Sequence, residues 1–206
     1  MKTRSLATVA LALGLSGCSI LPESDPATLY RLPEARLSSA ASNPVLAGKR
    51  LGVATPEAGH LIGSNRIVVF PERNVVNVYE GARWHQDAPE LIQSRLVDAL
   101  QRSGLFESVG VDRLPSDLVL LGELRHFQSE YDRTPPVAHV QLDVQLTGPN
   151  REPLASQTFE ARARAQSVEI PEVVNAFGAA SDTLTDELIT WLATLALPTL
   201  TSRIDD

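Results

Sequence analysis

Few residues in this chain have the type and spacing that catalytic or metal-binding chemistry requires. The sequence of 206 residues contains one cysteine, Cys18, and four histidines, which are His60, His85, His126 and His139. None of the histidines stands at a metal-ligand spacing from another histidine, the cysteine or a carboxylate on one predicted helix, and the zinc motif HExxH is absent. The GxSxG elbow of serine hydrolases, the phosphate-binding glycine loop and the dinucleotide fingerprint are also absent. His139 lies on a predicted strand, where a solvated or cross-strand position accounts for it.

The acidic side chains offer no better starting point for an enzyme. Asp182, Asp186 and Glu187 fall on the polar face of a predicted helix, where solvated carboxylates are the ordinary case. A hydrolase would need an acid and a base brought together from distant segments, and no motif in the chain asks for that. The sequence therefore predicts a protein with no catalytic residues, no metal and no cofactor.

The residues around Cys18 explain why the chain keeps a single cysteine. Lys2 and Arg4 give a positive start, residues 6–15 are mostly apolar, and small residues lead into Cys18. A basic start, a short apolar stretch and a small-residue exit are the parts of a secretory signal peptide, here residues 1–17. The apolar stretch of about ten residues is too short to span a bilayer, which needs about twenty. The alternative is a buried N-terminal helix with an incidental cysteine.

The tetrapeptide Leu15-Ser16-Gly17-Cys18 resembles the lipobox of bacterial lipoproteins, which a dedicated peptidase cuts just before the cysteine. The resemblance implies a diacylglycerol on the thiol of Cys18 and an acyl chain on its new amino terminus. Two or more acyl chains anchor a protein stably in a membrane, whereas one holds it only marginally. The next residue is Ser19 rather than the aspartate that marks inner-membrane retention, which favours the outer membrane. Cys18 is therefore predicted to be a lipid attachment site and not a catalyst.

The charge of the mature chain limits the partners that it can bind. The sequence has 18 basic and 25 acidic side chains, and removal of residues 1–17 takes away Lys2 and Arg4, which leaves 16 basic side chains and a formal charge of −9. An acidic chain without a basic run is a poor candidate for nucleic acid, whose binding depends on neutralised phosphates. It is equally poorly suited to electrostatic adhesion to anionic lipid headgroups. A single cysteine cannot form an intramolecular disulfide, so a hydrophobic core has to stabilise the fold.

Hydrophobic patterns predict one α+β domain. Alternating and β-branched runs bounded by turn residues predict strands over 28–32, 49–54, 66–70, 74–79, 105–111, 117–127, 137–146 and 154–165. Helical periodicity predicts one helix over 88–103 and a second from Pro171 to a point before Pro198. Such elements indicate a mainly antiparallel, mixed sheet with two amphipathic helices packed on one face. The expected organisation is a removed signal peptide over 1–17, a lipidated tether over 18–27, the domain over 28–197 and a tail over 198–206.

The first helix has the clearest predicted boundaries. Asp87 and Glu90 are spaced as in a capping box, Pro89 is tolerated in the first turn, and Gly104 supplies a C-terminal stop. The residues expected to face the sheet are Ile92, Leu96, Ala99 and Leu100, and those expected to face away are Gln93, Arg95, Asp98 and Gln101. The helix is therefore expected to bury one apolar stripe and to leave a polar outer face.

Several segments together resemble one protein family. After the lipobox these segments are Tyr30-Arg31-Leu32-Pro33, Arg66-Ile67-Val68, Val78-Tyr79, Trp84, the leucine-rich helix that leads into Ser103-Gly104-Leu105-Phe106, and the stretch VVNAFGAASDTLTDELITWL. Their order resembles the ABC-type transport auxiliary lipoproteins, the family of the paraquat-inducible protein C (PqiC), over about residues 28–195. The stretch Thr55–Asn65 departs from the compact Pro-x-x-Leu turn that such proteins tend to carry there.

The resemblance implies a lipoprotein component of a system that moves lipids between the inner and outer membranes. Its expected partners are an ABC transporter and an MCE-domain protein that forms a tunnel across the periplasm. The lipoprotein is expected to dock, without catalysis, on the distal end of that tunnel, and a homo-oligomeric ring is left open as an assembly. The alternative is a different outer-membrane lipoprotein that helps to assemble or activate an envelope enzyme.

The residues considered for partner contact are aromatic residues and prolines. Under the docking interpretation, Trp84 is either a core residue or part of a contact surface or apolar groove. Phe127, Tyr131 and the pair Pro135-Pro136 are expected in a loop that could meet a partner. A plain surface loop is the alternative for these four residues.

Overall fold

The structure, a computed structural model, describes residues 26–36 and 42–196. The predicted signal peptide, Cys18, most of the predicted tether and the predicted tail lie outside these residues. The described residues form a mixed sheet of nine strands and two helices in one domain, and the predicted α+β class is confirmed.

The sheet is organised around one long strand, β7 (Leu118–Glu130). The other strands are β1 (Thr28–Tyr30), β2 (Arg50–Val53), β3 (Glu57–Ala58), β4 (Arg66–Glu72), β5 (Val75–Trp84), β6 (Ser108–Val111), β8 (Val137–Thr147) and β9 (Pro153–Arg164). One edge of β7 pairs in turn with β2, β3 and β4, all parallel to it, and the other edge pairs with antiparallel β8. β6 lies beyond β2, the β4–β5 hairpin and β1 extend the sheet beyond β4, and β9 lies beyond β8. β7 thus lies at the centre of the sheet, and β4 and β5 form an antiparallel hairpin.

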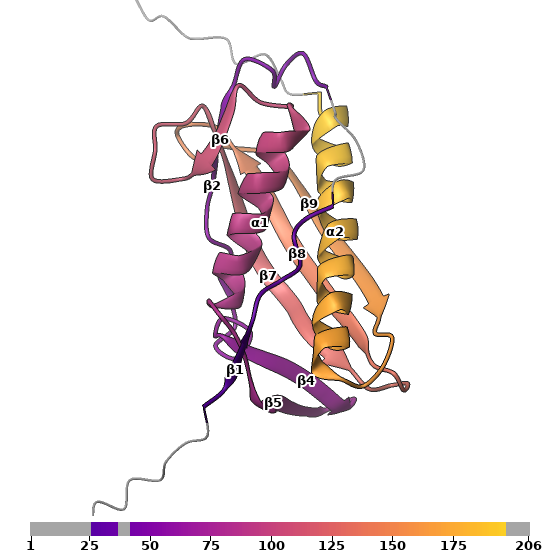
Figure 1. Ribbon diagram of the computed structural model, residues 1–206. Coiled ribbons are helices and arrows are strands. Elements are labelled where there is room, and N and C mark those ends of the chain that lie inside the picture. Colours follow the sequence, from indigo (N-terminus) through magenta and orange to yellow (C-terminus); the bar gives the residue numbers. More distant parts are fainter. Residues whose placement is uncertain (1–25, 37–41, 197–206) are drawn as a thin grey trace, which may run out of the picture.

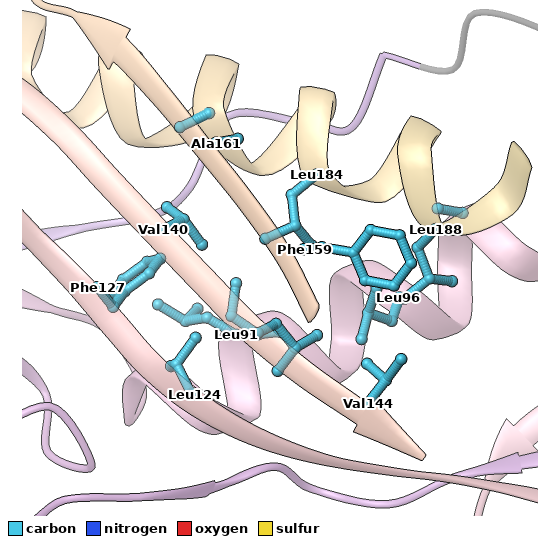
Figure 2. Packing of buried hydrophobic residues seen from close by; sticks show 14 of the residues in the cluster. Leu91, Leu96, Leu124, Phe127, Val140, Val144, Phe159, Ala161, Leu184 and Leu188 are labelled. Atoms are coloured by element: carbon cyan, nitrogen blue, oxygen red, sulfur yellow. The ribbon is translucent and has the colours of Figure 1, made fainter. Parts of the chain in front are cut away.

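Both helices, α1 (Ala88–Ser103) and α2 (Ile170–Thr194), cover the same face of the sheet (Figure 1). Alternation along β8 turns Val140, Leu142, Val144 and Leu146 toward this helical layer, and all four side chains are buried. Figure 2 shows apolar side chains from β7, β8, β9 and the two helices meeting there. The apolar stripe predicted for α1 is buried in the same core, so one face of the sheet holds the hydrophobic core of the domain.

The ends of α1 agree with the predicted signals in two respects out of three. Pro89 lies in the first turn, and Gly104 follows the helix with a φ of 72°, a left-handed conformation that glycine adopts without a Cβ clash. The side chain of Asp87 makes no capping hydrogen bond, so the predicted capping box is wrong. The turn before β4 contacts this end of the helix, because the carbonyl of Ser64 accepts a hydrogen bond from the backbone N–H of Ala88 (3.3 Å).

The predicted polar faces of the helices are partly covered, because residues 31–36 run between α1 and α2 after leaving β1 (Figure 1). Arg95 of α1 is buried under this segment and donates hydrogen bonds to the carbonyl of Pro33 (2.7 Å) and to the carboxylate of Asp182 in α2. The backbone N–H of Arg36 donates to the same carboxylate (2.9 Å). The predicted solvated position of Arg95 is therefore wrong, whereas Asp182 is partly exposed as well as paired. Helical periodicity alone does not show that another segment crosses the groove.

Two further contacts show how closely the elements approach. Gln93, also predicted to face away from the sheet, donates a hydrogen bond from its side-chain amide to the carbonyl of Val53 in β2 (2.9 Å). Gly178 of α2 leaves room for Pro33, because a Cβ at position 178 would lie only 2.8 Å from the proline Cγ. The segment after β1 is therefore an integral part of the helical layer.

Candidate functional site

Two residues considered for partner contact lie in the core. Trp84, at the end of β5, is fully buried, and Phe127 of β7 is 1% exposed. Both rings pack on Phe177 of α2, with centroid distances of 5.2 Å from Trp84 and 4.8 Å from Phe127. The core interpretation of Trp84 is confirmed, and the expected loop position of Phe127 is wrong because β7 continues to Glu130.

The other three residues considered for contact lie in the turn between β7 and β8. Tyr131 is partly exposed, and its hydroxyl accepts a hydrogen bond from the hydroxyl of Tyr79 (3.3 Å). Burial raises the pKa of Tyr79, which keeps this phenol protonated and able to donate. Pro135 is partly exposed, whereas Pro136 is buried and its carbonyl accepts a hydrogen bond from the backbone N–H of Ala165 (2.9 Å). Of the five residues considered for contact, only Tyr131 and Pro135 present part of their surface to a partner.

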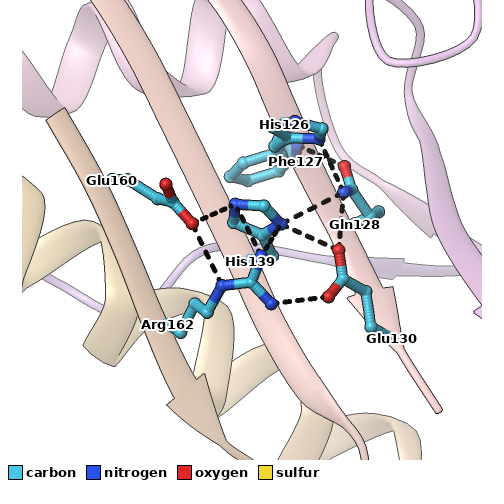
Figure 3. A network of polar contacts seen from close by, with 7 residues as sticks. All are labelled: His126, Phe127, Gln128, Glu130, His139, Glu160 and Arg162. Atoms are coloured by element: carbon cyan, nitrogen blue, oxygen red, sulfur yellow. Dashed lines mark hydrogen bonds and ion pairs between the residues drawn. The ribbon is translucent and has the colours of Figure 1, made fainter. Parts of the chain in front are cut away.

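A polar network that sequence reasoning did not predict lies on the sheet face opposite the helices, which we call the open face (Figure 3). At its centre is His139 of β8, which is 3% exposed. Its Nδ1 lies 2.8 Å from Oε1 of Glu130, and its Nε2 lies 3.1 Å from Oε1 of Glu160. Arg162 of β9, directly opposite His139 in the register, forms ion pairs with both carboxylates, at 2.8 and 3.1 Å. His139 thus has the predicted cross-strand position, but long side chains bury it.

A second histidine completes the network. The ring of His126 stacks on that of His139, with centroids 4.3 Å apart. Between them and Glu130, the buried amide of Gln128 lies 2.8 Å from Nδ1 of His126 and donates a hydrogen bond to Oε1 of Glu130 (3.0 Å). The six polar side chains thereby tie β7, β8 and β9 together.

The charges of the network follow from these contacts. Burial lowers the pKa of His126, and the neighbouring His139 lowers it further, so the His126 ring is neutral at pH 7. Burial alone would raise the pKa of Glu130, but the hydrogen bonds from His139 and Gln128 and the charge of Arg162 outweigh it. The net effect is a lowered pKa, so Glu130 is an ionised partner for Arg162.

This arrangement does not have the composition of an active site. Both carboxylates that contact His139 also pair with Arg162, so neither is free to act as a base. Within residues 26–36 and 42–196, no group of three histidine, cysteine or acidic residues could hold a metal ion. The remaining histidines lie apart, with His60 in an exposed turn and Nδ1 of His85 3.3 Å from the carbonyl of Tyr30. The network is best described as a cross-strand clamp.

A smaller group of ion pairs continues along the open face. Arg125 of β7 pairs with Glu123 (3.0 Å) and with Asp143 of β8 (2.9 Å), and Asp143 also accepts a hydrogen bond from the hydroxyl of Thr158 in β9 (2.7 Å). On α2, Glu187 is exposed and Asp186 partly exposed, as predicted for its polar face. None of the described helices is long and apolar enough to cross a membrane.

Comparison with known proteins identifies the class of the molecule. Residues 30–189 match the family model described as "ABC-type transport auxiliary lipoprotein component". The match covers most of the chain, and the chain belongs to this family. A search of curated proteins found no match.

Solved structures share this fold. The crystal structure of protein XCC0632 from Xanthomonas campestris is 32% identical in sequence, with a TM-score of 0.71, and the alignment covers 80% of this chain and 94% of that one. A second crystal structure, of an uncharacterized protein, has 15% identity and a TM-score of 0.64, and the alignment covers 82% of this chain and 99% of that one. The second likeness shows the fold alone.

Proposed function

We propose that this chain is a lipoprotein anchored to the periplasmic face of the outer membrane, and that it serves as a non-catalytic docking component of an intermembrane lipid transport system. The proposed partners are an ABC transporter and an MCE-domain protein. The observation that carries the proposal is the family match over residues 30–189, in a chain whose single cysteine follows a lipobox-like sequence. The family match supports a role as an auxiliary component of transport. The lipid cargo, the MCE-domain partner and the outer-membrane location are part of the proposal.

The proposed absence of catalysis is supported by what the polar clusters contain. Both carboxylates of the network around His139 are paired with Arg162, and the buried Arg95 is paired with Asp182. Groups that are fully engaged with one another are poorly placed to bind and transform a substrate. Their arrangement supports a role in holding the domain rigid for binding.

We place the docking contact at the turn between β7 and β8. Its exposed side chains are Asp132, Arg133 and Thr134, flanked by the partly exposed Tyr131 and Pro135. Trp84, Phe127 and Pro136 are buried and therefore do not form part of this contact surface.

The docking proposal is tested by capture of the purified MCE-domain protein on the immobilised, lipidated chain in mild detergent. The wild-type chain should retain the partner, and Arg133→Glu should lose it without a change in melting temperature. Arg113→Glu, the same charge change at an exposed site in the turn after β6, is the matched control and should retain the partner. No capture by the wild type, or loss only in variants that also unfold, would contradict the proposal.

The anchor is tested separately. Cys18→Ser should accumulate unprocessed precursor that no longer incorporates labelled palmitate, whereas the wild-type chain should be labelled and should sediment with outer-membrane vesicles. Equal labelling of the variant would remove Cys18 as the attachment site. Correct lipidation without partner capture would favour the alternative of an envelope assembly or activator lipoprotein. Mass measurement of the purified lipoprotein in detergent shows whether it forms the homo-oligomeric ring that the sequence left open.

A further inference from the structure

One end of the molecule combines the entry of the chain into the domain with exposed apolar side chains. Figure 1 shows β1, the β4–β5 hairpin, the β7–β8 turn and the first turn of α2 at the same end. We call this the hairpin end and define it by residues 28–29, 72–76, 131–136 and 165–169. The turn after β6 lies at the other end, beside the C-terminal ends of both helices.

Exposed apolar residues gather at the hairpin end. Among the described residues, the large hydrophobic side chains classed as exposed are Leu29, Val45, Val75, Val76, Val111, Leu114 and Val168. Four of these seven, Leu29, Val75, Val76 and Val168, belong to the hairpin end. The valines at 75 and 76 are adjacent in the chain and are 46% and 48% exposed. Adjacent exposed apolar residues such as these two valines are typical of a contact surface, whereas scattered single ones are ordinary.

The hairpin tip is open on both sides because it projects beyond its neighbour. β4 pairs with β7 only as far as Phe70 and Glu130, whereas the hairpin pairing continues to Glu72 and Val75. Successive strand residues point to opposite faces, so Val75 and Val76 expose both faces of the tip. The β-propensity of valine accounts for its presence in a strand, but Val75 and Val76 lie at a solvated tip, where they fill no core.

The position of β1, where the chain enters the domain, indicates how close this end can lie to the lipid on Cys18. Cys18 precedes Thr28 by ten residues, which can span at most about 35 Å. Thr28 pairs with Ala82 of β5, and the seven residues from there to Val75 extend about 23 Å. Acyl chains attached at Cys18 can therefore reach a membrane on which the hairpin tip rests.

The local charge allows such a contact although the chain as a whole is acidic. Glu72 is followed by Arg73 at the tip, and Asp132 is followed by Arg133 in the neighbouring turn. These two pairs of opposite charges cancel and Glu169 adds a single negative charge, so this end carries no concentration of negative charge that anionic headgroups would repel.

We propose that the hairpin end rests on the membrane surface, with Val75 and Val76 inserted at the headgroup level beside the acyl chains on Cys18. This contact rests on the lipid attachment included in the proposed function. Shallow insertion of exposed apolar side chains is a known mode of interfacial binding, and a nearby acyl anchor supplies the second attachment that stable binding needs. It would hold the domain in one orientation, with the turn 131–136 beside the membrane, where a partner that delivers lipid must also arrive.

A site-specific probe tests this contact in the lipidated chain. The thiol of Cys18 carries the lipid and the chain has no other cysteine, so Val76→Cys introduces the only free thiol for an environment-sensitive fluorophore. Leu114→Cys, 63% exposed before substitution and located at the other end, is the matched control. Both labelled proteins are incorporated into vesicles of phosphatidylethanolamine and phosphatidylglycerol, with and without bromine on the acyl chains.

The proposal expects a blue-shifted emission at position 76 and a loss of fluorescence when the lipids are brominated, with neither effect at position 114. Equal, water-like emission at both positions in protein that floats with the vesicles would overturn the membrane contact while leaving the anchor intact. A blue shift without quenching would also overturn it, because it would indicate shielding by protein. Failure of the wild-type protein to float would overturn the anchor and, with it, this contact.

Discussion

The two faces of the sheet use the same strands for opposite purposes. On the helical face, Trp84, Phe127 and Phe177 form a dry cluster with ring centroids 4.8 to 5.6 Å apart. On the open face, alternate residues of β7, β8 and β9 form ion pairs around the buried His139. The helical face supplies burial energy, whereas the charged side chains of the open face pair with one another and hold the strands in register. Since neither face offers free reactive groups, the ends of the molecule are its candidate contact surfaces.

The largest effect should come from removing an aromatic ring on the helical face. Phe127→Ala should lower the free energy of unfolding by about 3–5 kcal/mol, because it loses transfer energy and leaves a cavity. That is a large share of the total stability of about 5–15 kcal/mol that a domain of this kind has. Urea unfolding measures it, with the exposed Val111→Ala as a control that should change stability by less than about 0.5 kcal/mol. Equal effects at the two sites would remove the distinction between core and surface.

The next largest effect should come from the ion pair between the helices. Asp182→Asn leaves the guanidinium of Arg95, 5% exposed, without its charged partner. The expected loss is about 2–3 kcal/mol, less than the 3–5 kcal/mol of a fully buried pair, because the Asp182 side chain is 20% exposed. Asp98→Asn breaks the surface pair with Arg102 and should cost less than about 0.5 kcal/mol by the same urea measurement. If Asp182→Asn left the free energy of unfolding unchanged, the segment 31–36 would not shield this pair from solvent.

The open face should respond to pH. The pKa of His126 is lower in the folded chain than the unfolded value of about 6.5, because of burial and the neighbouring His139. Between these two pKa values the unfolded chain binds more protons than the folded chain. The stabilisation of the folded chain that comes from neutral His126 is therefore fully present above about pH 6.5 and is lost as pH falls through the folded pKa. The lowered pKa of Glu130 acts only below about pH 4.3, outside this window. The melting temperature should fall between about pH 7 and pH 5.5, and His126→Gln should reduce that fall; parallel curves for the two proteins would contradict the account.

The smallest effect should come from the exposed part of the same face. Arg125 is half exposed, and Arg125→Gln removes its pairs with Glu123 and Asp143. Solvent screening limits such pairs, so the expected loss is below about 1 kcal/mol and should shrink further in about 1 M salt. A loss as large as that of Phe127→Ala would show that the open face is a second core and that the two faces do not differ in this way.

Sequence reasoning predicted the parts of the fold that depend on local pattern. Alternation along β8 and the apolar stripe of α1 each require only their own residues, and both were confirmed. Arg95 and Asp182 could not be placed, because residues 31–36 reach the groove between the helices through long-range packing that leaves no periodic signal. The network around His139 depends on the register of three strands, and a shift of one residue would have turned His139 into the core. The charged residues Glu160 and Arg162 could have predicted a cross-strand network with His139 only if the register of β8 and β9 had been known.

The site of partner contact is the central claim that one measurement tests most directly. A photoreactive amino acid placed at Thr134, an exposed position in the β7–β8 turn, should crosslink to the MCE-domain protein in intact cells. The same group at Glu90, an exposed position in the first turn of α1 and 44 residues from Thr134 in the sequence, should not. Crosslinking at position 134 and not at position 90 is the result that the account predicts. Absence of any crosslink to that protein at position 134, in cells where the chain is lipidated and folded, would contradict it.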